Sequence, residues 1–303
     1  MTAALGWASA RQTADSAQER LRSRMHELAA DAEDRHERDF LVRLEERICA
    51  PDARIGRFGD ATGRVFDVLT RDQLVLRDVA RALERDPELV LDVWKAAWPR
   101  LGNPSGSIEQ AVSRLGPDQL WRIAVLDAEH APSFVAPGYE VAARRERALA
   151  LMTANLAGAS LPGQRETAYL AGLLHNTGSL LVYRCAVPLN PSHVPARHLV
   201  ERAAEQLRPL SSAVFLDGRR LKQAVVQAVA HAADPTYAPA GARQVARAVF
   251  AGRAVAMHVC GMALTTRFQL YQRLERIDMK PATANRLLYL ARQAHGHVGD
   301  LLA

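Results

Sequence analysis

Residues 167–183, TAYLAGLLHNTGSLLVY, form the most apolar window of this chain. Its first half contains three leucines at the spacing of one helix face, Leu170, Leu173 and Leu174. This spacing predicts a core helix. Gly172 lies inside that helix at a cost of about 1 kcal/mol relative to alanine, which indicates close packing by a neighbouring element. Gly178 is predicted to break the helix before a second buried segment.

Three polar residues, His175, Asn176 and Thr177, follow one another in this apolar setting. A histidine followed by a carboxylate at a helix end is a typical metal-binding pair, because both groups coordinate divalent cations. The second residue here is an asparagine, whose neutral amide is a poor ligand. The favoured interpretation is structural. A buried neutral imidazole can donate from one nitrogen and accept at the other, which would join two helix ends, with Asn176 or Thr177 as partners.

The composition is that of an ordinary globular protein. Of 303 residues, 49% are hydrophobic and 24% are charged, and no window reaches the ~18 apolar residues of a membrane span. The chain opens without a signal-peptide pattern and its three cysteines form no paired motif, so we expect a cytoplasmic protein with reduced thiols. The net charge is +6, and acids are interspersed among the basic residues, which are nearly all arginine. This pattern favours a solvated mixed-charge surface over a nucleic-acid surface.

Helix signals dominate the chain. There is no alternating run of β-branched residues and no hairpin signal, so we predict an all-α fold. Asp86 and Pro87 begin one helix, and Ser107 begins another that Gly116 ends. Further helices are predicted over residues 139–157, 164–175, 196–207, 221–232, 240–263, 268–276 and 282–302. Short strands are candidates only at 180–183 and 212–216.

The first fifty residues differ from the rest. Residues 17–49 are dense in charge, with apolar residues at three- and four-residue spacings and a break near Arg35, which fits one long helix or two shorter ones. Their narrow apolar stripe either packs on the chain itself or forms a homodimer or partner contact. A stretch rich in Pro, Gly and Asp follows. We therefore divide the chain into an N-terminal helical extension (1–52), a main domain (53–265) and C-terminal helices packed on it (266–303).

Several of these signals together resemble the HDOD family, the HD-related output domains of bacterial signalling proteins. The Asp86 segment resembles the DP-x-L element of the family, residues 107–116 its SI-xx-AV-xx-LG element, and residues 168–178 its AFLAGLLHDIG element. Residues 221–231 are similar to a later helix that ends in histidine, and residues 251–256 (AGRAVA) stand where the parent HD superfamily has AD-xx-A. The resemblance covers about residues 55–265 and implies a compact HDOD-like domain of helices.

The parent HD phosphohydrolases hold a divalent metal with an early histidine, a His-Asp pair and a later aspartate. The resemblance places Asn176 at the aspartate of the pair and Gly252 at the later aspartate, and residues 139–157 lack the early histidine. It therefore implies a degenerate metal site, with no metal, no other cofactor and no catalytic residue. What would remain is a vestigial cleft formed by His175, Asn176, Thr177, His231 and Gly252.

We therefore expect a non-catalytic regulatory module that acts by protein–protein interaction or ligand sensing in bacterial signal transduction. One alternative is a metal-dependent HD-type phosphohydrolase acting on a nucleotide or cyclic dinucleotide, which the missing carboxylates disfavour. A second is a nucleic-acid-binding regulator, which the interspersed acids disfavour. Its surface would use five arginines, Arg144, Arg145, Arg147, Arg219 and Arg220.

Overall fold

The computed structural model describes residues 17–32, 34–101, 107–130, 132–186, 195–219, 221–263, 265–296 and 298–299. The all-α prediction is confirmed, because no strand occurs in these residues and Arg57 and Ser133 form only an isolated bridge. Both strand candidates were wrong, since they lie within α10 (Thr177–Cys185) and α11 (Arg197–Leu216). Periodicity alone cannot distinguish a short apolar run in a buried helix from one in a strand.

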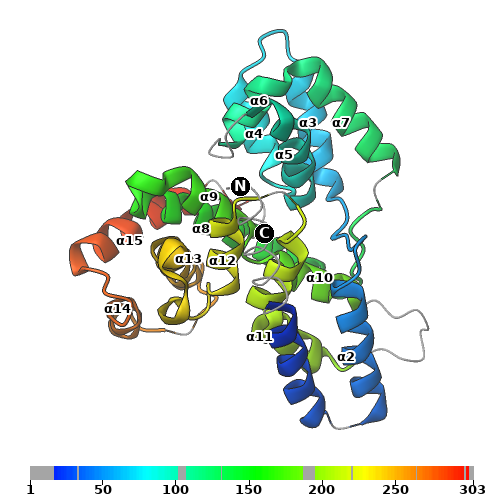
Figure 1. Cartoon of the computed structure of the whole chain (residues 1–303). Coiled ribbons are helices and arrows are strands. Elements are labelled where there is room, and N and C mark those ends of the chain that lie inside the picture. The colour runs from blue at the N-terminus through cyan, green and yellow to red at the C-terminus, as the bar shows by residue number, and fades with distance from the viewer. Residues whose placement is uncertain are drawn as a thin grey trace, which may run out of the picture.

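The helices form three groups (Figure 1). One group contains α3 (Gly59–Leu69), α4 (Leu76–Leu83), α5 (Pro87–Leu101), α6 (Ile108–Leu115) and α7 (Pro117–His130). A second contains α8 (Glu140–Ser160), α9 (Arg165–Leu174), α12 (Gln223–Ala230), α13 (Ala240–Val259), α14 (Arg267–Glu275) and α15 (Pro281–His295). The third contains the helix over residues 17–30, α2 (Arg35–Ile48), α10 and α11. The 3₁₀ turns η1 (Pro162–Gln164) and η2 (Pro235–Tyr237) connect helices of the second group.

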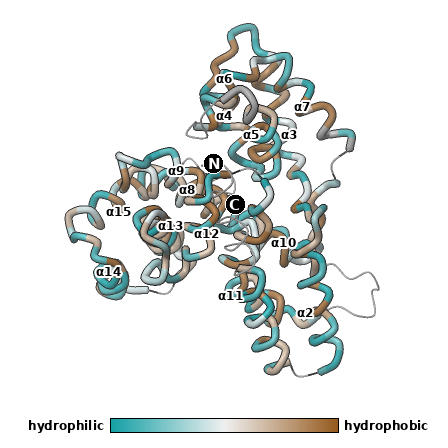
Figure 2. The backbone as a smooth tube through the Cα atoms, in the orientation of Figure 1, coloured by the Kyte–Doolittle hydropathy of each residue, from teal (hydrophilic) through white to brown (hydrophobic). Residues whose placement is uncertain are grey.

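Apolar positions gather around α8, α9 and α12 at the centre, whereas α14 is largely hydrophilic (Figure 2). Within the core, α8 packs against α9 and α13, and α10 packs against α11. The helix α3 begins within the segment after residue 49 whose Pro, Gly and Asp residues predicted a domain boundary. Among the helices described, none is long and apolar enough to cross a lipid bilayer.

Two glycines allow the central helices to approach one another. A Cβ atom on Gly172 would lie 2.8 Å from the Cα atom of Ala154 in α8, which confirms the expected close contact. A Cβ on Gly178 would lie 2.5 Å from the carbonyl oxygen of Arg208 in α11. Gly178 therefore does not break the helix; α9 ends at Leu174, and Gly178 lies in the first turn of α10.

The N-terminal segment consists of two helices, and Asp34 caps the second by accepting from the Glu37 amide at 2.8 Å. Its apolar stripe is buried within the chain, and α2 packs against α10 and α11. The buried residues include Leu21, Met25, Leu28, Phe40, Leu44 and Ile48. A homodimer or partner contact through residues 17–49 stays a prediction, and it would have to use their exposed side chains because the apolar stripe is already covered.

We predict that Gly178→Ala destabilises the chain by about 3 kcal/mol, the upper part of the range for overpacking, because the added methyl meets backbone atoms of α11. Urea-induced unfolding followed by circular dichroism measures the change. Gly241→Ala, in the first turn of α13 where nothing lies within 4 Å of the new methyl, is the matched control and should be neutral or slightly stabilising. Equal stability of the two variants would contradict the close contact.

Candidate functional site

His175 lies in the two-residue turn between α9 and α10 and is fully buried. Its Nδ1 atom is 2.6 Å from the carbonyl oxygen of Gly172, and its Nε2 atom is 3.2 Å from Nη1 of Arg253. A guanidinium group can only donate, so Nε2 accepts a hydrogen bond and Nδ1 carries the proton. The imidazole is therefore the neutral Nδ1–H tautomer, with both nitrogens satisfied.

Arg253 of α13 connects this imidazole to carboxylates on two other helices. Its Nη1 atom is also 3.2 Å from Oε2 of Glu146 in α8, and its Nη2 atom is 3.3 Å from Oε2 of Glu205 in α11. The Glu205 carboxylate accepts a second hydrogen bond from Arg208 at 2.7 Å. One buried guanidinium thus joins α8, α11, α13 and the turn at His175.

The charges in this cluster fix the protonation states. Burial lowers the pKa of His175 well below its usual value, and the positive charges of Arg253 and Arg208 lower it further. Burial alone would lower the pKa of Arg253, but the carboxylates of Glu146 and Glu205 outweigh that effect and raise it. The cluster therefore holds a neutral imidazole beside a permanently charged guanidinium.

Asn176 and Thr177 contribute to the same turn but do not bond to the imidazole, contrary to the prediction. The Asn176 amide nitrogen donates to the carbonyl oxygen of Glu146 and to its Oε2 atom, the latter at 3.0 Å. The Thr177 hydroxyl donates to the Leu174 carbonyl at 3.0 Å and so caps the end of α9. The amide of Asn176 matches the Glu146 carboxylate, whereas an aspartate there would place two carboxylates against each other.

Ser212 of α11 fixes the other side of the turn. Its hydroxyl accepts from the Gly178 amide at 2.7 Å and donates to the His175 carbonyl at 3.0 Å. The backbone of the turn is thus hydrogen-bonded to α11, while its side chains bond to α8, α13 and the end of α9. Such a satisfied network holds a single arrangement of the helices.

The five residues predicted to form a cleft are not brought together as a cleft. His175, Asn176 and Thr177 are at most 1% exposed. His231, at the end of α12, is half-buried, and its Nε2 atom lies 3.4 Å from Arg20 in the N-terminal helix. Gly252 is buried against α8, where an added Cβ would lie 3.0 Å from the Thr153 carbonyl oxygen. The structure thus gives His175 two hydrogen-bond partners, as the structural interpretation expects, and places His231 apart from the other residues of the predicted vestigial cleft.

The side chains present do not fit the metal that the HD superfamily implies. The Nε2 lone pair of His175 already accepts from Arg253, and Asn176 turns its N–H group toward Glu146. Within the described residues, no group of three His, Cys, Asp or Glu side chains could hold a metal ion. The centre of the cluster is instead a guanidinium held by two carboxylates.

Sequence reasoning missed four members of this cluster, Glu146, Glu205, Arg208 and Arg253. Arg253 stands alone as a charged residue in the apolar run AVFAGRAVAM of residues 248–257. An arginine in such a setting needs a buried partner, so the signal was available. Glu146 lies between Arg145 and Arg147, in the segment 139–157, where the sequence pattern indicated only a missing histidine and a positive charge.

Two of the arginines suggested for a nucleic-acid surface are used internally. Arg147 is 4% exposed, donates to both carboxylate oxygens of Asp60 at 3.0 and 2.9 Å, and lies 4.1 Å from the centre of the Phe58 ring. Arg219 donates to the Ala53 carbonyl at 2.6 Å. The Arg147 contacts connect α8 to α3, the Arg219 contact connects the turn after α11 to the loop before α3, and Arg220 lies outside the described residues.

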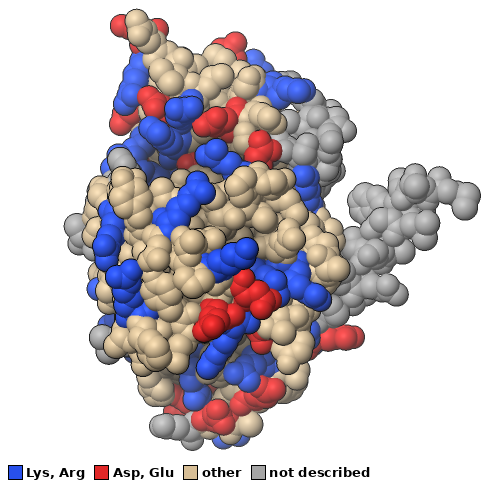
Figure 3. Space-filling model, turned by 90° about the vertical axis from the view of Figure 1, so that its left-hand side faces the viewer, with Lys and Arg blue, Asp and Glu red and all other residues tan. Residues whose placement is uncertain are grey.

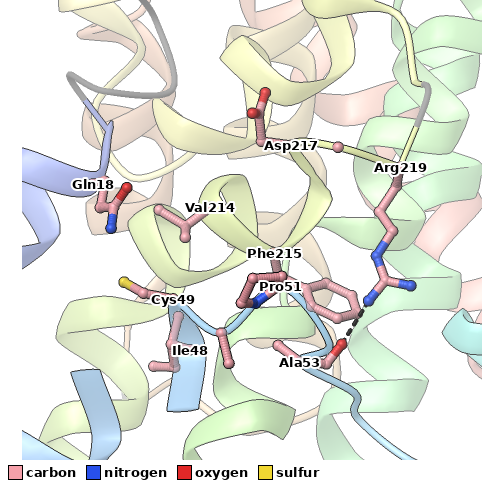
Figure 4. A pocket seen from close by; sticks show the side chains of 11 residues that line it. Gln18, Ile48, Cys49, Pro51, Ala53, Val214, Phe215, Asp217 and Arg219 are labelled. Atoms are coloured by element: carbon pink, nitrogen blue, oxygen red, sulfur yellow. Dashed lines mark hydrogen bonds between the residues drawn. The ribbon is translucent and has the colours of Figure 1, made fainter. Parts of the chain in front are cut away.

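A pocket of about 220 Å³ lies between the N-terminal helices and the end of α11, away from His175 (Figure 4). Ile48, Pro51 and Phe215 form part of its apolar wall. Arg219 lies over the Phe215 ring at 4.5 Å, and burial raises the pKa of the Cys49 thiol, which keeps it protonated. The pocket therefore lacks both a free cation and a reactive thiolate.

Residues 56–206 match the family model of the HDOD domain. The fold is similar to the crystal structure of the MmoQ response regulator from Methylococcus capsulatus str. Bath, with a TM-score of 0.56 and 16% identity over 79% of this chain and 99% of that one. A structure from Shewanella amazonensis SB2B, described as a candidate metal-dependent phosphohydrolase, has a TM-score of 0.46 and 21% identity over 86% of this chain and 98% of that one. No curated protein matches this chain.

We predict that Arg253→Met destabilises the chain by about 3–5 kcal/mol, because it leaves the Glu146 carboxylate, which is only 12% exposed, without its ion-pair partner. Arg253→Lys keeps the charge but cannot reach all three acceptors, so its loss should be smaller. Urea unfolding at pH 7.5 measures both. A loss below about 0.5 kcal/mol for the methionine variant, typical of a surface substitution, would show that the cluster contributes little.

A second prediction concerns pH. Because folding lowers the pKa of His175, the unfolded chain binds more protons below about pH 6.5. The contribution of His175 to the free energy of unfolding is fully present above that pH. It falls by about 1.4 kcal/mol between pH 7.5 and 5.5. The glutamine of His175→Gln retains a hydrogen-bond donor and an acceptor but does not titrate. The unfolding free energy of this variant should therefore decrease by about 1.4 kcal/mol less than that of the wild type over this pH range.

The comparison between the two proteins cancels other titrating groups. One is Glu84, whose pKa burial raises to about 7 and whose contribution therefore has the opposite sign. Identical pH profiles of unfolding free energy for wild type and His175→Gln would mean that the imidazole is not held neutral.

Proposed function

This chain belongs to the HDOD family, and from this we propose that it is a non-catalytic regulatory module acting through protein–protein contacts in bacterial signal transduction. The observation that carries the proposal is the hydrogen bond between Arg253 and Nε2 of His175. This bond uses the lone pair with which an imidazole would bind a metal. The guanidinium has no empty orbital, so it cannot polarise a bound water as a metal ion does.

Burial supports the same proposal. His175 and Thr177 have no exposed surface and Asn176 has 1%. A phosphoester would have to separate α9 and α10 from α8 and α13 to approach the imidazole. An enzyme site needs reacting groups that its substrate can contact, whereas a domain that presents an outer surface to a partner needs only a firm interior.

In this proposal residues 53–265 form the regulatory domain, residues 1–52 are an N-terminal helical extension, and residues 266–303 are C-terminal helices packed on the domain. The module acts in the cytoplasm. One protein of the same fold is described as a response regulator, which agrees with a signalling role. The phosphohydrolase alternative would require a set of metal ligands that these side chains do not offer. The nucleic-acid alternative is disfavoured because Arg147 and Arg219 make contacts within the chain.

We predict that the protein purified without chelators contains well under one transition metal per chain and does not hydrolyse a cyclic dinucleotide or bis(p-nitrophenyl) phosphate with added Mn²⁺. Elemental analysis and product release measure these two properties. One metal per chain that His175→Ala removes, or turnover that depends on Mn²⁺ and on His175, would overturn the proposal.

A further inference from the structure

The two C-terminal helices carry an unbalanced charge. Residues 265–296 contain six Lys or Arg side chains and two acidic ones, whereas the whole chain has 39 and 33. All six basic side chains are exposed, namely Arg267, Arg273, Arg276, Lys280, Arg286 and Arg292. Much of the net charge of +6 therefore lies on α14, α15 and their connection.

These basic side chains form no ion pairs within the described residues, unlike many arginines elsewhere. Arg22, Arg147 and Arg197 each lie within 2.9 Å of a carboxylate oxygen. None of the six forms an ion pair with any residue in the described ranges, and Asp278, one of the two local acids, is bound to Arg247 of α13 at 2.8 Å. The positive charge of this region is therefore available to an external partner.

Aromatic and amide side chains lie among these charges. Phe268 and Tyr289 are 71% and 62% exposed. Arg267 donates to the Asn285 side chain at 2.9 Å, and the Tyr271 hydroxyl donates to the same oxygen. These bonds join α14 to α15, so Arg267 is held in place before any partner arrives.

The exposed face of α15 also carries basic and aromatic side chains. Its buried residues, Ala284, Leu287, Leu288 and Ala291, belong to the helix face that packs against α8 and α13. Arg286, Tyr289 and Arg292 are exposed on the remaining face. Figure 3 views the molecule from the side of these helices and shows basic side chains spread over the face, with a small group of acidic side chains beside them near its middle. We define the C-terminal basic surface as Arg267, Phe268, Asn285, Arg286, Tyr289 and Arg292.

We propose that the C-terminal basic surface binds an acidic face of a partner protein. The inference rests on the proposed function and adds the place and the chemistry of the contact. Protein interfaces are enriched in arginine and in aromatic residues, and tyrosine and arginine dominate their binding energy. Duplex DNA would offer phosphates but little apolar surface for Phe268 and Tyr289, whereas a protein face supplies carboxylates and apolar side chains together.

A second copy of this chain is not the occupant that the charges favour. The acids of the N-terminal helices are interspersed with arginines, and several are bound to them, as in the pairs of Glu45 with Arg22 and Asp31 with Arg202. The described residues of these helices, 17–32 and 34–48, thus offer no surface of one negative sign, which favours another protein as the source of the complementary face.

The test is site-specific photocrosslinking in the native host, with a photoreactive phenylalanine analogue at position 268 or 289 of the full chain. We expect a crosslinked peptide rich in Asp and Glu from one protein. That protein, purified, should bind the full chain at least 10-fold more weakly when Arg267, Arg286 and Arg292 are all replaced by glutamine. The matched control replaces three other exposed arginines, Arg35, Arg77 and Arg81, and should bind as wild type does.

Crosslinks only to nucleic acid or lipid, only to neutral or basic peptides, or to nothing would overturn the inference. So would equal weakening by the two triple variants, which would indicate non-specific attraction. If a partner binds the chain but the glutamine variant at the C-terminal basic surface binds it unchanged, the regulatory role stands and only this surface is wrong. Metal-dependent turnover would instead remove the proposed function itself.

Discussion

The arrangement of the core depends on one buried cation. The Arg253 guanidinium lies 3.2 Å from both the His175 imidazole and the Glu146 carboxylate, and 3.3 Å from Glu205. Isolating a charge in the interior is costly unless hydrogen-bonded partners of opposite charge compensate it. The partners come from α8, α11 and the α9–α10 turn, so the requirement to satisfy one side chain specifies how four parts of the chain meet.

The same constraint gives the histidine at 175 a structural role. An apolar residue at 175 would leave an Arg253 N–H group and the Gly172 carbonyl without partners, and each buried unsatisfied polar group costs about 1–3 kcal/mol. The imidazole is useful here because it both donates and accepts while remaining uncharged. Its neighbour Asn176 is the amide that the Glu146 carboxylate needs. The residues that suggest an enzyme are therefore explained by hydrogen bonding alone.

Local signals in the sequence predicted local structure well. Asp86 accepts from the Leu89 amide at 3.1 Å and caps α5, and Ser107 accepts from the Gln110 amide at 3.1 Å and caps α6. Gly172 indicated close helix packing, and α8 packs there. Each of these features involves residues near in sequence or a steric demand that only glycine meets.

The partners of the imidazole could not be predicted in the same way. Arg253 is 78 residues from His175 in sequence, and no local pattern states which helix faces which. For the same reason the stripe over residues 17–49 gave no indication of what covers it, and it packs in part on α10 and α11, far along the chain. A charged residue within an apolar run, such as Arg253, does indicate that a distant partner exists, because a buried charge requires one.

The glycine at 252 limits the substitutions that the core can accept. Even the first carbon of an aspartate side chain at this position would lie 3.0 Å from the Thr153 carbonyl oxygen, so the backbone of α8 would have to shift by a few tenths of an ångström to accommodate it. Asn176→Asp alone would set a second carboxylate against Glu146. A carboxylate at either position is thus expected to lower the stability of the fold. The packing of α8 on α13 therefore restricts which side chains residues 176 and 252 can carry, whereas exposed positions are free of this restriction.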